Sequence, residues 1–173
     1  MILTGTQIAS ERASGRILLS PFDHESITTN SYDLTLGDDL IAYVDPVLDP
    51  RRAPQTRPVL FNEDGTCRLE RGDFVLGHSR EIVGSDFFVP IIHARSSIAR
   101  LGLFVHVTAD LIDIGSKGQI TFQLYATLPI ILRRGMKLGQ VSFWVPKGEI
   151  TLYDGKYKNS TGPRSSMAFR DGC

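Results

Sequence analysis

The chain has 173 residues, and its 19 basic and 19 acidic residues give a formal net charge of zero. This balance argues against duplex DNA or an anionic membrane surface as a partner, because both attract strongly basic proteins. The length suits one domain, and 16 glycines and 9 prolines among short apolar runs favour a strand-rich fold with many turns.

The cysteine content and the apolar runs limit the cellular setting. Cys67 and Cys173 are too few for a disulfide scaffold and lack metal-ligand spacing. No apolar run is long enough to span a bilayer, and the first residues lack the charged-then-apolar pattern of a signal peptide. We therefore expect a cytoplasmic protein without a membrane segment.

The first third of the chain predicts a helix and then strands. Residues 4–16 contain small and helix-forming residues up to a glycine, which predicts a short N-terminal helix. ILLSPF (17–22) is typical of a strand that ends at proline. Residues 31–44 alternate apolar and polar side chains, with Asp33 on the polar face, which predicts a half-buried strand with a turn at 37–39. Residues 45–58 contain four prolines and predict an irregular surface loop within the same domain.

The rest of the chain predicts strands at roughly regular spacing. The candidate strands are GDFVLGHS (72–79), REIVGSDFFVPIIHAR (80–95), LGLFVHVT (101–108), GQITFQLYA (118–126), LPIILRRG (128–135) and KLGQVSFWVP (137–146). Such spacing with turn residues between strands is the pattern of a β-barrel or a β-sandwich. The polar, basic segment 153–173 is either a frayed end or a segment that orders over a bound anion.

RSSIARLG (95–102) is a candidate phosphate site. Its four polar members, Arg95, Ser96, Ser97 and Arg100, lie within six residues, directly after a predicted strand. Ser96 or Ser97 could cap a single helical turn, and forked guanidinium donors suit phosphate oxygens. The alternative is that both arginines pair with surface carboxylates.

The histidines do not predict a metal site. His93 and His106 each stand alone in a predicted strand, without a carboxylate or cysteine at ligand spacing, so structural roles are favoured. The signature of zinc-dependent nucleobase deaminases, H-x-E followed by P-C-x-x-C, is absent. Any chemistry on a base would therefore proceed without zinc.

The stretch IDIGSKGQITFQL (112–124) joins an aspartate to an alternating strand. Period-two alternation predicts Ile120, Phe122 and Leu124 on one face and Thr121, Gln123 and Tyr125 on the other. Gln123 thus lies on the polar face, about ten residues after Asp113 and across a corner with two glycines. It is either an ordinary solvent-facing residue or part of a site.

Five motifs together resemble the dCTP deaminase branch of the dUTPase superfamily. They are SYDLTLG (31–37), RSSIARLGLFVHVTA (95–109), ID-x-G-x-x-GQIT (112–121), RRGMKLGQVSF (133–143) and YDGKYKNSTGP (153–163). The resemblance implies an all-β fold, a distorted β-barrel or jelly-roll-like core of the dUTPase type, formed by a single domain of residues 1–173. It also implies a homotrimer with active sites between subunits, a pyrimidine deoxynucleoside triphosphate as substrate, and Mg²⁺ bound through the triphosphate rather than by the protein.

The resemblance also implies residue roles. Arg95, Ser96, Ser97 and Arg100 would contact phosphates, with Ser96 also near the base. The carbonyl of Ala109 would hold the attacking water, and Asp113 would lie by the deoxyribose and activate water in dUTP-hydrolysing members. Segment 153–173 would be a C-terminal lid or tail, in which the residues that close over the triphosphate are Tyr153, Lys156 and Ser160, the last at a position usually held by glutamine.

Gln123 aligns with the glutamate that acts as general acid and base in the family's deamination. An amide does not titrate near neutral pH, and loss of such a group typically costs ~10²–10⁴ in rate. Ser116 and Ser160 also depart from the family pattern, which favours natural divergence over one engineered change. The amide could face either a 4-oxo or a 4-amino pyrimidine, depending on its orientation.

Three hypotheses for the function follow. The first is a dCTP deaminase with a rearranged proton path, which would release ammonia from dCTP. The second is a dUTP diphosphatase that uses Asp113 and Mg²⁺. The third is a trimeric nucleotide-binding or regulatory protein without catalysis.

Overall fold

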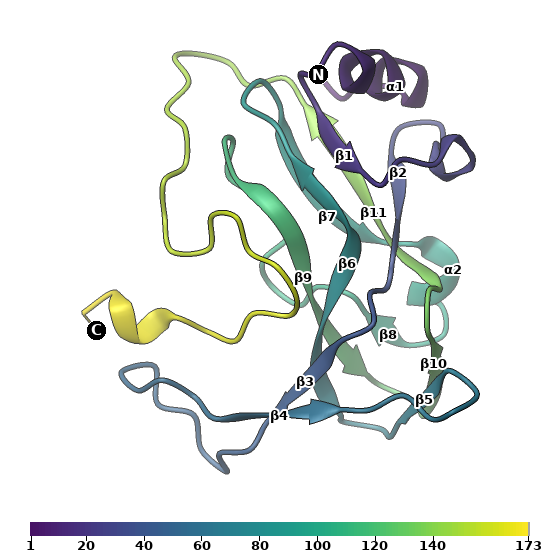
Figure 1. Ribbon diagram of the computed structural model, residues 1–173, viewed down its shortest axis with the longest axis vertical. Coiled ribbons are helices and arrows are strands. Elements are labelled where there is room, and N and C mark those ends of the chain that lie inside the picture. The colour runs from purple at the N-terminus through teal and green to yellow at the C-terminus, as the bar shows by residue number, and fades with distance from the viewer. Residues whose placement is uncertain (173) are drawn as a thin grey trace.

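The computed structural model describes residues 1–172, which form mainly short antiparallel strands (Figure 1). The helices are α1 (Gly5–Ala13) and α2 (Ser96–Ala99), with 3-10 turns η1 (His24–Ser26) and η2 (Ala168–Arg170). The strands are β1 (Leu18–Ser20), β2 (Tyr32–Thr35), β3 (Leu40–Tyr43), β4 (Thr56–Val59), β5 (Thr66–Leu69), β6 (Phe74–Gly84), β7 (Val89–Ala94), β8 (Leu103–Phe104), β9 (Lys117–Ala126), β10 (Ile130–Arg133) and β11 (Lys137–Trp144). The predicted mainly-β fold with a short N-terminal helix is confirmed. None of the helices within residues 1–172 is long and apolar enough to cross a membrane.

Three sheets make up the fold. The largest has the order β4-β3-β6-β9-β8, with β1 also paired to β6, and the others are β2-β11-β7 and β10-β5. The longest pairing joins β6 to β9, from Phe74 opposite Tyr125 to Gly84 opposite Lys117. Gln123 therefore lies in the interior of the largest sheet, opposite Leu76.

The core is filled from the apolar faces of these sheets. Phe122 and Leu124 of β9 are 1% and 0% exposed, and Phe143 of β11 and Tyr32 of β2 are also fully buried. The alternation of β9 produces this pattern, because successive side chains of a strand point to opposite faces. The same alternation leaves the face that carries Gln123 half-buried.

The strand predicted over residues 31–44, with its turn at 37–39, corresponds to β2 and β3 on either side of that turn. It differs in burial, because β2 is not half-buried and Asp33 on its polar face is only 5% exposed. The register of β2 with β11 sets Asp33 opposite Gln140, and the guanidinium of Arg95 reaches it from the end of β7. Burial of this carboxylate is tolerated because a cation compensates its charge.

The chain after β11 crosses the molecule and brings its C-terminal segment to the side opposite α2. In Figure 1 this segment, coloured yellow, lies beside β9, whereas α2 lies at the other edge of the view. Backbone hydrogen bonds join the segment to the loop before β9 and to the first residues of β9, as described below. The motif on α2 and the motifs on β9 and the C-terminal segment are therefore separated within one chain.

Candidate functional site

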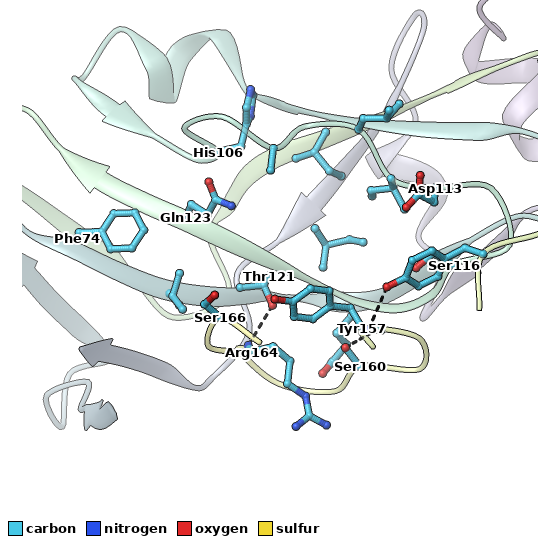
Figure 2. Close-up of a pocket in the computed structure, with 18 of the residues that line it drawn as sticks. Phe74, His106, Asp113, Ser116, Thr121, Gln123, Tyr157, Ser160, Arg164 and Ser166 are labelled. Carbon is cyan, nitrogen blue, oxygen red and sulfur yellow. Dashed lines mark hydrogen bonds between the residues drawn. The ribbon is translucent and has the colours of Figure 1, made fainter. Parts of the chain in front are cut away.

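A pocket of about 430 Å³ opens beside β9. Figure 2 shows that its walls come from β9, the stretch after β8, the corner before β9 and the C-terminal segment. Its polar and aromatic lining residues are Tyr43, Phe74, His106, Asp113, Ser116, Gln119, Thr121, Gln123, Tyr153, Tyr157, Ser160, Arg164 and Ser166. Most of these side chains carry hydrogen-bonding groups, so the pocket suits a polar ligand with an apolar ring.

Strand β9 supplies the floor of the pocket. Thr121 and Gln123 both line it, while Phe122 and Leu124 point into the core. Ile120 also lines the pocket and is half-buried, although alternation predicts it on the core side. The register shift between β6 and β9 occurs next to this position, between His78 and Ile82, so strict alternation is interrupted there.

The Gln123 side chain is held by the segment that follows β8. Its backbone N–H donates to the Val105 carbonyl at 2.9 Å. Its side-chain Oε1 accepts a hydrogen bond from the Val107 N–H at 3.1 Å. Figure 2 shows the amide nitrogen directed into the pocket. Two hydrogen bonds to the segment after β8 thus fix both the backbone and the side-chain rotamer of Gln123.

Asp113 and Ala109 lie on the chain between β8 and β9. Both are exposed and both line the pocket. This segment is anchored along β7, where the Ile92 N–H donates to the Asp110 carbonyl at 2.9 Å and the Ile112 N–H donates to the Pro90 carbonyl at 3.0 Å. The anchoring presents the Asp113 carboxylate to the pocket without an ion-pair partner among residues 1–172.

The C-terminal segment closes one side of the pocket through backbone contacts at the glycine corner. A Cβ on Gly115 would lie 2.8 Å from the Cβ of Leu152, and a Cβ on Gly118 would lie 2.8 Å from the N and O atoms of Ser160. These distances are too short for any side chain, so both glycines are required for the close approach. The Tyr153 N–H donates to the Ile114 carbonyl at 2.8 Å beside this corner.

Side chains of β9 and β3 continue this docking. Gln119 Oε1 accepts from the Gly162 N–H at 2.7 Å, and Thr121 Oγ1 accepts from the Arg164 N–H at 3.0 Å. The Tyr43 hydroxyl accepts from the Ser166 N–H at 3.1 Å. The segment therefore docks on its own chain through backbone and side-chain hydrogen bonds, rather than forming a frayed end.

The three predicted residues of the C-terminal segment have different surroundings. Tyr153 and Ser160 line the pocket, and the Ser160 hydroxyl donates to the Tyr157 carbonyl at 2.6 Å. Lys156 does not line it and instead pairs with Asp171. The hydrogen bond to that carboxylate raises the pKa of Lys156.

The RSSIAR cluster lies outside this pocket. Ser96, Ser97 and Arg100 are exposed on or beside α2 and do not line the pocket of the same chain. The expected serine cap is absent, since Arg95 is the N-cap residue of α2 and makes no side-chain cap. The backbone turns at Arg95 directly out of β7 into α2, where both serines are exposed.

Arg95 has a structural role in this chain. Its Nε lies 3.2 Å from Oδ2 of Asp33, and its Nη1 donates to the Lys137 carbonyl at 3.3 Å. Burial raises the pKa of Asp33, although the charges of Arg95 and Lys137 act in the opposite direction. The predicted alternative of an arginine–carboxylate pair thus applies to Arg95, with a buried rather than a surface carboxylate.

The two histidines have different surroundings. His93 Nε2 lies 2.9 Å from the Ser142 hydroxyl, and burial lowers the pKa of His93. His106 lies after β8 rather than within a strand, lines the pocket, and has a buried Nδ1 without a partner in residues 1–172. The sequence indicated no place for His106 in a site, because a single histidine carries no ligand-spacing signal.

Further lining residues had no individual signal in the sequence. Tyr157 and Arg164 belong to the basic C-terminal segment, which was noted only as a whole. Tyr43 and Phe74 come from β3 and β6, and their rings stack with centroids 6.4 Å apart. Their places depend on strand pairing rather than on a local pattern. Residues 1–172 contain no group of three His, Cys, Asp or Glu side chains that could hold a metal ion.

Comparison with known proteins defines the family. Residues 2–145 match the sequence profile of a family described as dCTP deaminase-like. The chain belongs to this dCTP deaminase-like family. Proteins named "dCTP deaminase, dUMP-forming" from Clostridium beijerinckii and Leptospira biflexa are 37% and 36% identical to it, over 99% of this chain and 98% of each relative.

A solved structure supports the same fold. The 2'-deoxycytidine 5'-triphosphate deaminase from Agrobacterium tumefaciens is similar with a TM-score of 0.63 and 21% sequence identity. The match covers 84% of this chain but only 48% of that chain. At this identity the likeness establishes the fold alone.

Proposed function

We propose that this dCTP deaminase-like protein acts in pyrimidine deoxynucleotide metabolism and hydrolyses dUTP to dUMP and pyrophosphate. The observation that carries the proposal is the contrast between two pocket residues. Asp113 presents an open carboxylate to the pocket, whereas the amide of Gln123 cannot exchange protons near neutral pH. The pocket thus retains a group that can activate water and lacks one that can move protons at the base. The name "dUMP-forming" of the full-length relatives supports this choice.

The chemistry assigned to Asp113 is hydrolysis at the α-phosphorus. The carboxylate orients a water molecule and takes its proton as the water oxygen bonds to phosphorus. The bond from the α-phosphorus to the bridging oxygen breaks, and pyrophosphate leaves. Positioning and charge stabilisation account for most of the rate in such reactions, so Asp113 needs to act only on the water, while other groups hold the phosphates.

The protein works as a homotrimer in this proposal, and α2 of a neighbouring subunit completes the pocket. Ser96, Ser97 and Arg100 are exposed and lie away from the pocket of their own chain, so a ligand there would need them from another copy. Exposed apolar side chains near α2 support an interface on this side, since Leu101 is 55% and Phe104 48% exposed.

Mg²⁺ enters with the triphosphate. Mg²⁺ tends to keep part of its water shell and to bind phosphate oxygens, so the triphosphate would be its main ligand here. When bound, Mg²⁺ neutralises phosphate charge and favours departure of pyrophosphate. In this chain, Tyr153 and Ser160 would close over the nucleotide, so that segment 153–172 serves as the lid.

Deamination of dCTP is the second candidate, because full-length relatives carry the name dCTP deaminase. Ala109 lines the pocket near Gln123, so an attacking water could be held there. The amide at position 123 removes the general acid and base, which predicts a rate ~10²–10⁴ lower than with a carboxylate.

The experiment follows ammonia and pyrophosphate together, with Mg²⁺ and each of dCTP, dUTP and dTTP. The wild type is expected to release pyrophosphate from dUTP and no ammonia from dCTP. Asp113→Asn should abolish pyrophosphate release, and Gln123→Glu should gain ammonia release. Ammonia from the wild type would favour the second candidate. Nucleotide binding without any turnover would mean a regulatory protein and would refute the hydrolysis.

A separate experiment addresses the phosphate cluster. Arg100→Ala should weaken triphosphate binding by about tenfold or more, since a hydrogen bond to a charged group is lost. The thermal midpoint without ligand should barely change, because Arg100 is exposed. Lys147→Ala, which removes another exposed cation, is the matched control. Equal affinity for both variants would refute the assignment of α2 to the phosphates.

A further inference from the structure

The orientation of the Gln123 amide is determined by its partner. The two ends of a glutamine amide differ chemically, because the oxygen only accepts and the nitrogen only donates hydrogen bonds. The partner at 3.1 Å is the backbone N–H of Val107, which can only donate. The atom facing Val107 must therefore be Oε1, and the opposite orientation would place two donors against each other.

The nitrogen of the same amide is left for a ligand. No hydrogen bond joins Nε2 to another atom of residues 1–172, and Figure 2 shows it directed into the pocket. The other pocket amide differs, because Gln119 accepts from the Gly162 N–H with its oxygen and donates to the Arg80 carbonyl with its nitrogen. Gln119 is thus occupied at both ends, while Gln123 offers one free donor.

We propose that Gln123 makes this site select a 4-oxo pyrimidine, uracil or thymine, over a 4-amino pyrimidine. The inference rests on the proposed function, in which the base lies in this pocket with its C4 edge at Gln123. Uracil and thymine present the O4 acceptor at that edge, and Nε2 donates to it. Cytosine presents its amino group there, which is also a donor, so the pair would leave two donors unsatisfied.

A carboxylate at the same position would reverse the preference. In Gln123→Glu one oxygen would still accept from Val107, and the other would face the pocket as an acceptor. That oxygen would accept from a 4-amino group and repel O4. The hydrogen bond to Val107 is therefore the reason why one atom of the side chain decides which base is bound.

Binding is measured by calorimetry with Mg²⁺ and the α,β-imido analogues of dUTP, dTTP and dCTP, which resist hydrolysis. The wild type should bind the dUTP analogue about tenfold or more tightly than the dCTP analogue. The dTTP analogue carries the same O4 as uracil and an added 5-methyl group, so it should bind more tightly than the dCTP analogue if O4 decides the preference. Gln123→Glu should bind the dCTP analogue more tightly than the dUTP analogue.

Two further variants keep the outcome decisive. Gln55→Glu makes the same amide-to-carboxylate change at an exposed position that does not line the pocket, and the ratio of the two affinities should stay as in the wild type. Gln123→Met has a similar size and no hydrogen-bonding end, so the ratio should fall to near one, and this variant serves if Gln123→Glu does not fold.

Several outcomes would overturn the inference. Equal or tighter binding of the dCTP analogue by the wild type is one, and an unchanged ratio in both Gln123 variants is another. Hydrolysis of dUTP without any base preference in binding would remove this inference and leave the proposed function. A clear 4-oxo preference without hydrolysis would refute the proposed function and leave the base preference. Absence of binding to all three analogues would refute both.

Discussion

Replacement of Gly118 by alanine is expected to release the part of the C-terminal segment around Ser160 from the pocket while the sheet stays folded. The new Cβ would lie 2.8 Å from the backbone N and O of Ser160, which is closer than real Cβ contacts. Both partners are backbone atoms, so the part of the segment around Ser160 must move away. Three hydrogen bonds hold this part beside Gly118, from the N–H groups of Gln119, Asn159 and Gly162, at 2.8, 2.8 and 2.7 Å.

The size of the effect follows from these bonds. Each contributes about 1 kcal/mol net, so their loss weakens docking by roughly 3 kcal/mol, which corresponds to about a hundredfold change in the opening equilibrium. Hydrogen exchange measured by NMR reports this directly, because the three amides are protected only while the segment is docked. They should exchange about a hundredfold faster in Gly118→Ala, while amides of β11 should be unchanged.

Gly135→Ala is the control for this experiment. A Cβ there would meet nothing within 4 Å, but the residue has a φ of 73°, so the substitution costs about 1–2 kcal/mol through backbone strain alone. It should lower global stability without faster exchange in the C-terminal segment. Unchanged exchange of the three amides in Gly118→Ala, or equal release in Gly135→Ala, would refute the role assigned to the glycine corner.

Two further predictions concern stability. Burial lowers the pKa of His93, whose ring lies at hydrogen-bonding distance from Ser142 and near His106 and Asp110. His93 therefore takes up a proton more readily in the unfolded chain than in the folded one as the pH falls below its ordinary pKa of 6.5. The free energy of unfolding, measured by urea denaturation, should therefore decrease below about pH 6.5 in the wild type and decrease less in His93→Asn. Identical pH profiles of the two proteins would contradict this. Phe122→Ala should destabilise by about 3–5 kcal/mol in the same assay, because the ring is 1% exposed, and a loss below 1 kcal/mol would mean that β9 is not a core strand.

Local sequence patterns predicted the parts of the fold that depend on neighbouring residues. The helix at residues 5–13 and the strand at 117–126 follow from composition and alternation, and so does the burial of Phe122 and Leu124. Ordered motifs along the chain also indicated the family, because residue type and spacing are visible without coordinates. Asp113 and Gln123 were candidates on this basis alone.

The tertiary structure decided what depends on distant partners. The direction of the Gln123 amide is set by Val107, and the burial of Asp33 is made tolerable by Arg95, more than 60 residues later in the chain. The docking of the C-terminal segment depends on space above Gly118 that no periodicity reveals. Alternation determines only which face a side chain occupies, whereas hydrogen-bond direction and close backbone approach are determined by atoms that folding brings from elsewhere.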